Sequence, residues 1–241
     1  MGENLFGFYP KPLRLPIGKK LYKKKYMPYK KVFDLLEDKV IIEEKMDGKP
    51  VLLIGEKYLV LAEDLKETRS IKYKIPARFA IFDIYDRKNG VLSFRQKISA
   101  YYELKYLSRL EPFRIYPTEE IVYPDSMFMV RVIAIGNFKL EDLPSFITYS
   151  PYAAEPNTYM EGIVVKSYNS IVIGSEAGKI IANELNYQVN RIKQKQKTTE
   201  QIEYNIIDPQ MKEINPIIEN IIFFPSGLIS DVYKYKIKQK N

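Results

Sequence analysis

The chain has 241 residues, 46% of them hydrophobic and 28% charged, a composition typical of a globular protein with a sizeable core. It contains no cysteine and no histidine, which excludes disulfides, thiolate nucleophiles and every catalytic or metal site that needs an imidazole. The formal net charge of +8 indicates an anionic partner, with nucleic acid as the first candidate and surplus lysine on a solvated surface as the alternative.

The sequence shows no membrane-spanning or targeting segment. No apolar run approaches the roughly 20 residues that a transmembrane helix needs. The first residues lack a basic region followed by an apolar one, so no signal peptide is expected. We therefore expect a cytoplasmic protein with no membrane partner. Because cysteine and histidine are absent, an oxygen-bound ion such as Mg²⁺ is the natural metal.

Residues 1–30 are rich in proline, lysine and tyrosine, which predicts an extended or loop-rich arm. The lysines are interleaved with Tyr22, Tyr26 and Tyr29, a mixture that suits contact with phosphates and stacking on bases. Two further basic clusters lie at residues 191–197 and 234–240. These positions favour nucleic acid as the anionic partner.

Short apolar segments separated by turn residues follow from residue 32 onward. We predict a helical turn at 32–36 and strands at 40–42, 51–54, 58–61 and 79–85. Gly55-Glu56 joins two of these strands, and Asn89-Gly90 ends the last one. Residues 93–110 carry apolar side chains at helical spacing, which predicts an amphipathic helix.

The second half of the chain is less regular. Residues 127–135 are apolar and fit a strand or a helix equally, whereas 162–166 and 170–173 predict paired strands around Asn169. Beyond about residue 183 the sequence is polar and rich in glutamine and lysine, which favours a small helical element. We predict an α+β fold dominated by antiparallel strands, with one domain at 1–183 and a small basic element at 184–241.

Lys45 is the first candidate for chemistry. It opens the tetrapeptide Lys45-Met46-Asp47-Gly48, directly after an apolar strand and after two carboxylates, Glu43 and Glu44. A glycine at this place lets the backbone approach a ligand closely. An amine attacks only in its neutral form, so burial or nearby positive charge is expected around a nucleophilic lysine. Taken alone, the tetrapeptide also fits a surface turn.

A second candidate segment runs from Glu161 to Lys166, an apolar strand with a carboxylate at its start and a lysine at its end. Side chains alternate along a strand, so the two charges are expected on opposite faces. Both reach one ligand only if the backbone departs from ideal pleating, and Gly162 is the place where that is expected. The alternative is an ordinary apolar strand flanked by solvated charges.

Together these segments resemble the covalent nucleotidyltransferase superfamily of DNA ligases, RNA ligases and mRNA capping enzymes, and within it the ATP-dependent RNA ligase family most. The resemblance implies a mainly antiparallel adenylation domain in which Lys45 becomes adenylated, with Asp47 as a second catalytic residue and Gly48 at the nucleotide. The stretch from Ala62 through residues 70–73 resembles a Gly-Glu-Asn-Leu motif running into Ser-Ile-x-Tyr, and it places the glutamate of that motif at Glu63.

The resemblance extends to three later segments. It implies that the Phe82 ring packs against adenine, that Glu161 serves metal-assisted steps, and that Lys166 and Lys179 contact phosphates. Glu43 and Glu44 are then expected among the nucleotide-binding residues. The cofactors implied are ATP and Mg²⁺ or Mn²⁺, with Glu63 and Glu161 as the metal ligands.

Three positions depart from the family pattern. An arginine usually found shortly after the nucleophile is missing between residues 46 and 62, Ala62 replaces a glycine, and Ile181 occupies the place of a second basic residue. The expected function is an ATP-dependent RNA ligase that joins 5′-phosphate and 3′-hydroxyl ends through lysyl-AMP, with RNA favoured over DNA. The alternatives are a non-catalytic or partner-dependent nucleic-acid-binding relative, a DNA ligase or a capping guanylyltransferase.

Overall fold

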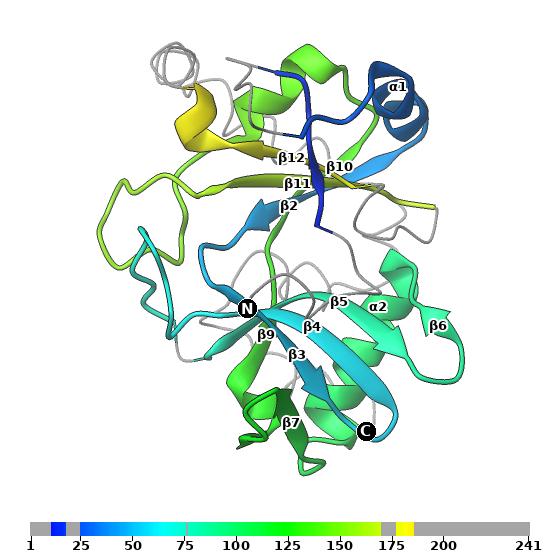
Figure 1. The fold of residues 1–241 in the computed structure, drawn as a ribbon, viewed down its shortest axis with the longest axis vertical. Coiled ribbons are helices and arrows are strands. Elements are labelled where there is room, and N and C mark those ends of the chain that lie inside the picture. Colours follow the sequence, from blue (N-terminus) through cyan, green and yellow to red (C-terminus); the bar gives the residue numbers. More distant parts are fainter. Residues whose placement is uncertain (1–10, 18–24, 76, 170–176, 186–241) are drawn as a thin grey trace, which may run out of the picture.

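The computed structural model describes residues 11–17, 25–75, 77–169 and 177–185, and these residues form two β-sheets that lie one above the other (Figure 1). The five-stranded upper sheet has the order β1-β12-β11-β2-β10. The seven-stranded lower sheet has the order β6-β5-β4-β3-β7-β8, with β9 paired to β5. All pairings are antiparallel except β1 with β12 and β5 with β9, so the predicted α+β class with mainly antiparallel strands is confirmed.

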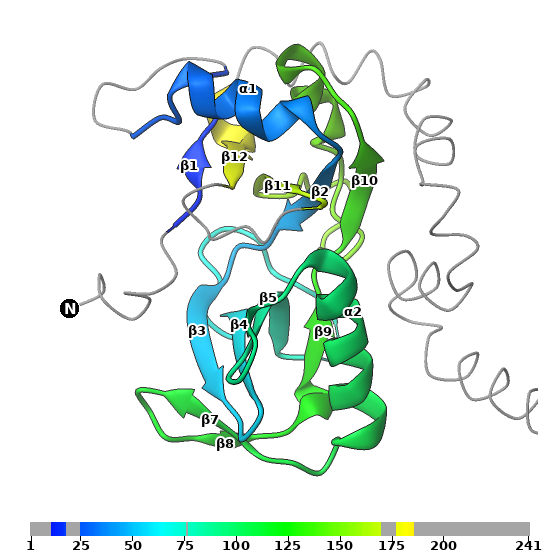
Figure 2. The same ribbon diagram turned by 90° about the vertical axis from the view of Figure 1, so that its right-hand side faces the viewer.

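The upper sheet combines strands from distant parts of the sequence. Its strands are β1 (Leu13–Arg14), β2 (Val40–Lys45), β10 (Val132–Gly136), β11 (Gly162–Ser167) and β12 (Gly178–Ile181). The helix α1 (Tyr29–Glu37) and a 3₁₀ helix (Leu140–Phe146) cover its outer face (Figure 2). Alternate residues of the strands, including Ile42, pack beneath these helices and bury their apolar surface.

The lower sheet is built from a nearly continuous part of the chain. Its strands are β3 (Lys49–Ile54), β4 (Tyr58–Asp64), β5 (Phe79–Asp86), β6 (Gly90–Val91), β7 (Phe113–Tyr116), β8 (Ile121–Val122) and β9 (Met127–Met129). The helix α2 (Phe94–Tyr102) continues into a π-helical turn (Glu103–Leu107), and both lie along this sheet (Figure 2). Their apolar stripe packs on the strands and forms the larger core.

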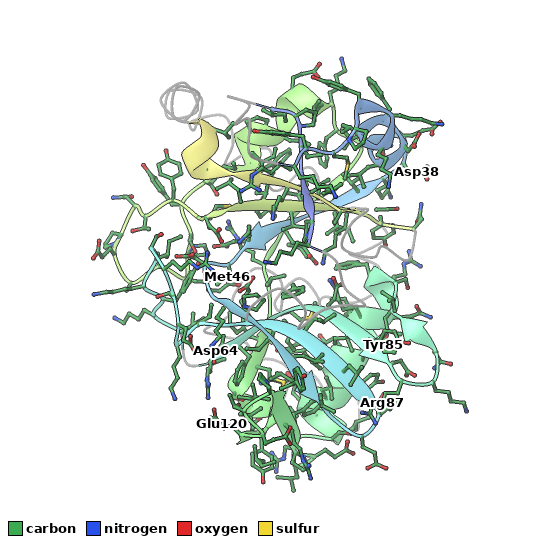
Figure 3. The ribbon with its side chains drawn as sticks, viewed as in Figure 1. Asp38, Met46, Asp64, Tyr85, Arg87 and Glu120 are labelled. Carbon is green, nitrogen blue, oxygen red and sulfur yellow. The ribbon has the colours of Figure 1, made fainter. Side chains whose placement is uncertain are left out.

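Short 3₁₀ turns complete the described elements, at Pro124–Ser126 and Ala182–Leu185. Ion pairs tie the end of β4 to a loop of the lower sheet, because Arg78 donates to Asp64 at 2.7 Å and to Glu120 at 2.5 Å. Asp64 and Glu120 are labelled in Figure 3. None of the helices in the described part of the chain is long and apolar enough to cross a bilayer.

Most of the predicted elements are confirmed. The segments at 32–36, 40–42, 51–54, 58–61, 79–85 and 93–110 all form the predicted strand or helix, with ends shifted by a few residues. Gly90 adopts a φ of 89°, which explains the glycine after Asn89. The segment 127–135, which fitted a strand or a helix equally, forms strands. There are two of them in different sheets, because the chain crosses from β9 to β10 at residues 130–131.

The hairpin predicted around Asn169 is only partly covered. Its first strand is β11, and the neighbours of β11 among the described residues are β2 and β12. The second predicted strand, 170–173, and the C-terminal element at 184–241 lie outside the described residues, apart from the end of the 3₁₀ turn at Leu185. The division into two domains therefore stays a prediction.

Candidate active site

A pocket of about 400 Å³ lies between the two sheets, within the size range of small-molecule sites. Its lining includes Met46 (labelled in Figure 3), where the chain passes from β2 to β3, and Val130, where the chain returns to the upper sheet. Every residue that the sequence analysis selected for catalysis, cofactor or metal binding lines this pocket. The full lining comprises Lys11, Pro12, Arg14, Glu43, Glu44, Lys45, Met46, Asp47, Gly48, Pro50, Glu63, Arg69, Phe82, Val130, Glu161, Val164, Lys166, Lys179 and Ile181.

Lys45 is the last residue of β2, just before the chain passes from the upper sheet to the lower one. The register of β2 with β11 sets it opposite Gly162, next to Glu161, and its Nζ forms an ion pair with Glu161 Oε2. The two side chains are 21% and 25% exposed, so a molecule in the pocket reaches both of them. Lys45 is therefore accessible from the pocket and has a carboxylate in direct contact, and its predicted role as the nucleophile stays a prediction.

Asp47 and Gly48 shape the wall beside Lys45. A Cβ atom at Gly48 would come within 2.8 Å of Asp64 O and 2.9 Å of Glu63 Cβ, so only glycine allows this approach to β4. The buried carboxylate of Asp47 accepts hydrogen bonds from the backbone N–H groups of Ser70 and Ile71, at 2.5 and 2.9 Å. The geometry gives Asp47 a supporting position, and its predicted catalytic role stays a prediction.

Glu161 and Lys166 both line the pocket, although they occupy alternate faces of an ideal strand. Glu161 precedes β11, and the strand then turns Val164 and Lys166 towards the pocket while Ile163 packs in the upper core. A Cβ atom at Gly162 would lie 2.0 Å from the backbone oxygen of residue 180, so β11 and β12 approach closely at this glycine. β11 pairs in continuous register with β2 and β12 from Gly162 onward, so no bulge of the predicted kind lies within the strand, and Glu161 reaches the pocket because it precedes the strand.

Glu63 is half-buried in the pocket wall. Its Oε2 is shielded from solvent and has no hydrogen-bond partner. Burial raises the pKa of Glu63 to about 8; the positive charge of Lys45 lowers it, and the negative charge of Glu161 raises it further. A cation between Glu63 and Glu161 would relieve both the burial cost and the repulsion.

Lys179 faces the pocket from β12. Burial lowers the pKa of its ammonium to about 8, and the positive charges of Lys45 and Arg14 lower it further. No hydrogen bond or ion pair joins its Nζ to another described residue. An anion bound here would offset the repulsion among these cations.

A cluster of four charged side chains lies beneath Phe82. Lys166 Nζ lies 2.8 Å from Glu43 Oε2, 2.9 Å from Asp83 Oδ2 and 2.8 Å from the backbone oxygen of Phe82. Lys97 Nζ, from α2, lies 2.7 Å from Glu43 Oε1 and 2.9 Å from the same backbone oxygen. Lys166 was predicted to contact phosphates; its ammonium is held among protein carboxylates, and contact with phosphate stays a prediction.

Glu44 and Phe82 border the less polar part of the pocket. Glu44 is buried and accepts a hydrogen bond from Arg131 Nε at 3.1 Å. Burial raises its pKa, whereas the Arg131 charge lowers it. Phe82 is half-buried in β5 and belongs to the same apolar cluster as Met46 and Val130. These side chains provide a surface on which a planar base can pack.

Comparison with known proteins gives fold-level likeness only. No protein-family model and no curated protein matches the sequence. A solved structure of a Naegleria gruberi RNA ligase, an apo lysine-to-alanine mutant, is 15% identical with a TM-score of 0.43 and aligns over 73% of this chain and 61% of its own. A second Naegleria gruberi RNA ligase mutant, with ATP and Mn, is 13% identical with a TM-score of 0.43 and aligns over 77% and 63%.

The chain therefore spans less than two thirds of the length of these structural neighbours. At this identity and TM-score the likeness carries no argument about chemistry. The function has to be argued from the pocket itself.

Three basic residues of the pocket were not predicted from the sequence. Lys11, Arg14 and Arg69 line it, whereas the only basic residues between 46 and 62 pair elsewhere, Lys49 with Glu67 and Lys57 with the π-helical turn. Arg69 directly precedes the predicted 70–73 motif, which was a usable signal. Arg14 is brought in by long-range strand pairing, which no local pattern reveals.

Lys97 was also missed, and here the sequence did hold a signal. Phe94, Lys97, Ile98 and Tyr101 stand at helical positions i, i+3, i+4 and i+7, so the lysine interrupts the apolar stripe of α2. A lysine on a buried stripe requires an anionic partner. Glu43 is that partner.

Proposed function

We propose that this protein is an ATP-dependent nucleotidyltransferase of the ligase type, in which Lys45 takes up AMP and passes it to the 5′-phosphate end of RNA. One observation carries the proposal. Lys45, Glu63 and Lys179 from three strands, together with Glu161 just before a fourth, converge on one pocket that also contains the Phe82 ring. Chance placement of a surface lysine does not produce this convergence.

The pocket divides chemically into parts that match a nucleotide. Phe82, Met46 and Val130 supply the apolar surface for a base. Lys179 and its basic neighbours supply positive charge for phosphates. Lys45 directly precedes Met46 in the chain, and its charge is close enough to lower the pKa of Lys179, so it adjoins both parts. We expect a nucleotide that spans the pocket to place its α-phosphate beside the lysine.

The proposed first step forms a bond between Lys45 Nζ and the α-phosphorus of ATP and breaks the bond to pyrophosphate, which leaves. The amine must lose a proton, and Glu161 is in contact with the Nζ that releases it. In the second step AMP passes from the lysine to an oxygen of a 5′-phosphate. A 3′-hydroxyl then attacks that phosphate, and AMP leaves as the ends join.

A divalent metal ion fits the carboxylates of this pocket. Among the described residues no group of three or more acidic side chains is placed to hold a metal. Mg²⁺ is bound through one or two carboxylates together with substrate phosphates and water, so Glu63 and Glu161 suffice. The buried, unpartnered Oε2 of Glu63 supports this assignment. Such an ion supplies charge neutralisation at the phosphates.

RNA is the proposed polynucleotide. The net charge of +8 suits a polyanion, although it does not distinguish RNA from DNA. The preference for RNA rests on the sequence segments at 70–73 and 82–83, which resemble RNA ligases. Nicked duplexes that carry RNA or DNA on the 3′-hydroxyl side test it, and faster sealing of the RNA-ended nick is expected.

The test of the nucleophile is covalent labelling. Protein incubated with Mg²⁺ or Mn²⁺ and α-phosphate-labelled ATP should retain the label, and Lys45→Ala should retain none. Lys49→Ala is the matched control, because Lys49 is exposed, pairs with Glu67 and does not line the pocket. Equal labelling of wild type and Lys45→Ala removes the proposal, and preference for labelled GTP favours a guanylyltransferase.

A second candidate is a nucleic-acid-binding relative that has lost turnover. The apolar Ile181 in the pocket wall, where a second cation was expected, favours it. This candidate predicts salt-sensitive RNA binding with no covalent label. Measuring both properties on one preparation separates the two functions.

A further inference from the structure

We propose that Arg14 supplies a phosphate-binding cation of this pocket, beside Lys179, and replaces the basic residue missing at Ile181. The inference rests on the proposed function, because it takes the phosphate chain of a nucleotide as the ligand. It assigns a role to the short strand β1, which precedes the nucleophile by some thirty residues in the sequence.

Strand pairing fixes the backbone of Arg14 next to Lys179. β1 runs parallel to β12 with Arg14 opposite Lys179. Hydrogen bonds on both sides of Arg14 hold this register, from Leu13 N to Ala177 O at 3.1 Å and from Leu15 N to Lys179 O at 2.9 Å. Neighbouring strands lie about 4.8 Å apart, so side chains on the same face reach one ligand.

Alternation turns Arg14 towards the pocket. Leu13 and Leu15, on either side of it, pack against the upper core, with Leu15 buried. Leu13 and Leu15 therefore face away from the pocket, whereas Arg14 lines it. Lys179 and Ile181 share that face of β12, since Ile180 between them belongs to the core.

Gly178 in β12 leaves room for the segment that contains β1. A Cβ atom at Gly178 would lie 2.5 Å from Leu15 Cδ2, so the leucine occupies the space that any other residue would fill. On its other edge β1 meets a second segment, because Met27 N donates to Arg14 O at 2.7 Å. Arg14 is thus held by backbone contacts on both edges rather than by a surface loop.

The charge around Lys179 identifies the class of ligand. The side chains of Arg14 and Lys45 are close enough to disfavour its ammonium, and Lys11 adds to the repulsion. The negative charge of Glu161 offsets part of this repulsion, and an anion bound beside Arg14 and Lys179 would offset more of it. Arg14 and Lys179 stand side by side and together can bind more anionic oxygens than one carboxylate offers, so the phosphate chain of ATP fits better than a single carboxylate.

The test measures ATP binding directly, in a Lys45→Ala background so that no covalent step intervenes. Titration calorimetry compares ATP with adenosine, which lacks the phosphates. Adding Arg14→Ala should weaken ATP binding by about tenfold or more, the usual effect of losing a charge-assisted hydrogen bond, and leave adenosine binding unchanged. Arg114→Ala removes the same charge from an exposed position outside the pocket and should change neither.

A second variant tests the replacement of Ile181. Adding Ile181→Lys to Arg14→Ala returns a cation to the same face of the pocket and should recover most of the lost ATP affinity. Full recovery also shows that Arg14→Ala is folded. A loss without recovery contradicts the replacement.

Two outcomes overturn the inference outright. One is unchanged ATP affinity in Arg14→Ala, and the other is an equal loss for ATP and adenosine, which indicates a structural effect. Both leave the proposed function standing if wild type is labelled at Lys45. Conversely, absence of labelling together with weaker ATP binding in Arg14→Ala removes the reaction and keeps the phosphate site.

Discussion

Two groups of ion pairs begin on the same strand, β2, only two residues apart, and they differ in burial. Glu43 is paired with Lys97 and Lys166, and these three side chains are 1%, 2% and 7% exposed. Among the described residues Lys45 forms its ion pair with Glu161, and these two side chains are 21% and 25% exposed. Glu43 and Lys166 line the same pocket, but their charges are paired below the surface, whereas the charges of Lys45 and Glu161 are partly open to solvent.

The difference separates support from chemistry. A fully buried ion pair becomes costly when one partner is lost, because the remaining charge stays buried. A partly exposed pair contributes little to stability, so its members are available for reaction. The buried group holds β2, β5, β11 and α2 together beneath Phe82, and Lys45 is presented above it.

The largest effect is expected when the buried group is broken. Lys97→Met leaves a carboxylate of the cluster without its lysine and should lower the free energy of unfolding by roughly 3–5 kcal/mol. Urea denaturation measures the loss. Lys57→Met is the matched control: Lys57 pairs with Glu103 at 2.7 Å but is half-exposed, and its loss should cost about 1 kcal/mol or less.

Equal losses of stability in Lys97→Met and Lys57→Met would contradict the difference between buried and exposed ion pairs. A double variant, Lys97→Met with Glu43→Gln, tests the same difference more closely. Removing the two opposite charges together leaves Lys166 with Asp83, at 2.9 Å. The double variant should therefore be more stable than Lys97→Met alone.

The next effect concerns a buried group that has no partner. The pKa of Glu63 is raised from 4.5 to about 8, so this carboxyl contributes stability that is fully present below about pH 4.5 and is lost as pH rises through 8. Wild type and Glu63→Gln should be similarly stable at pH 4.5. At pH 8.5 the variant should be more stable, on the order of 4 kcal/mol, because the pKa rises by about 3.5, from 4.5 to about 8, and each pKa unit corresponds to about 1.36 kcal/mol.

The measurement is urea denaturation of both proteins from pH 4.5 to 8.5 without divalent metal. Taking the difference between the two curves removes groups they share, including Lys179, whose pKa is also about 8. A difference that stays constant with pH contradicts the burial of an unpartnered Glu63. Mg²⁺ should stabilise wild type more than the variant at the upper end of the range.

Local patterns in the sequence predicted much of this arrangement. Alternation and helical spacing placed β2 to β5 and α2, and the ordered motifs selected residues that all line one pocket. The two strands within 127–135 were not separable, because both are apolar and the crossing at 130–131 carries no turn residue. Arg14 was not predictable either, since only the pairing of β1 with β12 brings it to the pocket.

A smaller effect is expected at Asp47. Asp47→Ala removes the acceptor for two backbone N–H groups, at Ser70 and Ile71, and should cost about 2 kcal/mol, whereas Asp47→Asn keeps an oxygen and should cost less. Hydrogen exchange of these two amides measures the local opening. Unchanged exchange in Asp47→Ala contradicts the supporting position of Asp47.

The smallest effect on stability is expected at Lys45, the residue proposed as the nucleophile. Lys45→Met removes an ion pair in which both side chains are partly exposed, so the free energy of unfolding should change by about 1 kcal/mol or less. The same variant should lose all covalent labelling by ATP. Lys97→Met, normalised to folded protein at low temperature, should retain labelling, because Lys97 does not line the pocket. Measuring stability and labelling on both variants tests the distinction between supporting and reacting residues directly. If the Lys45 variant is as unstable as the Lys97 variant, Lys45 belongs to the supporting framework. The case for Lys45 as the nucleophile is then lost.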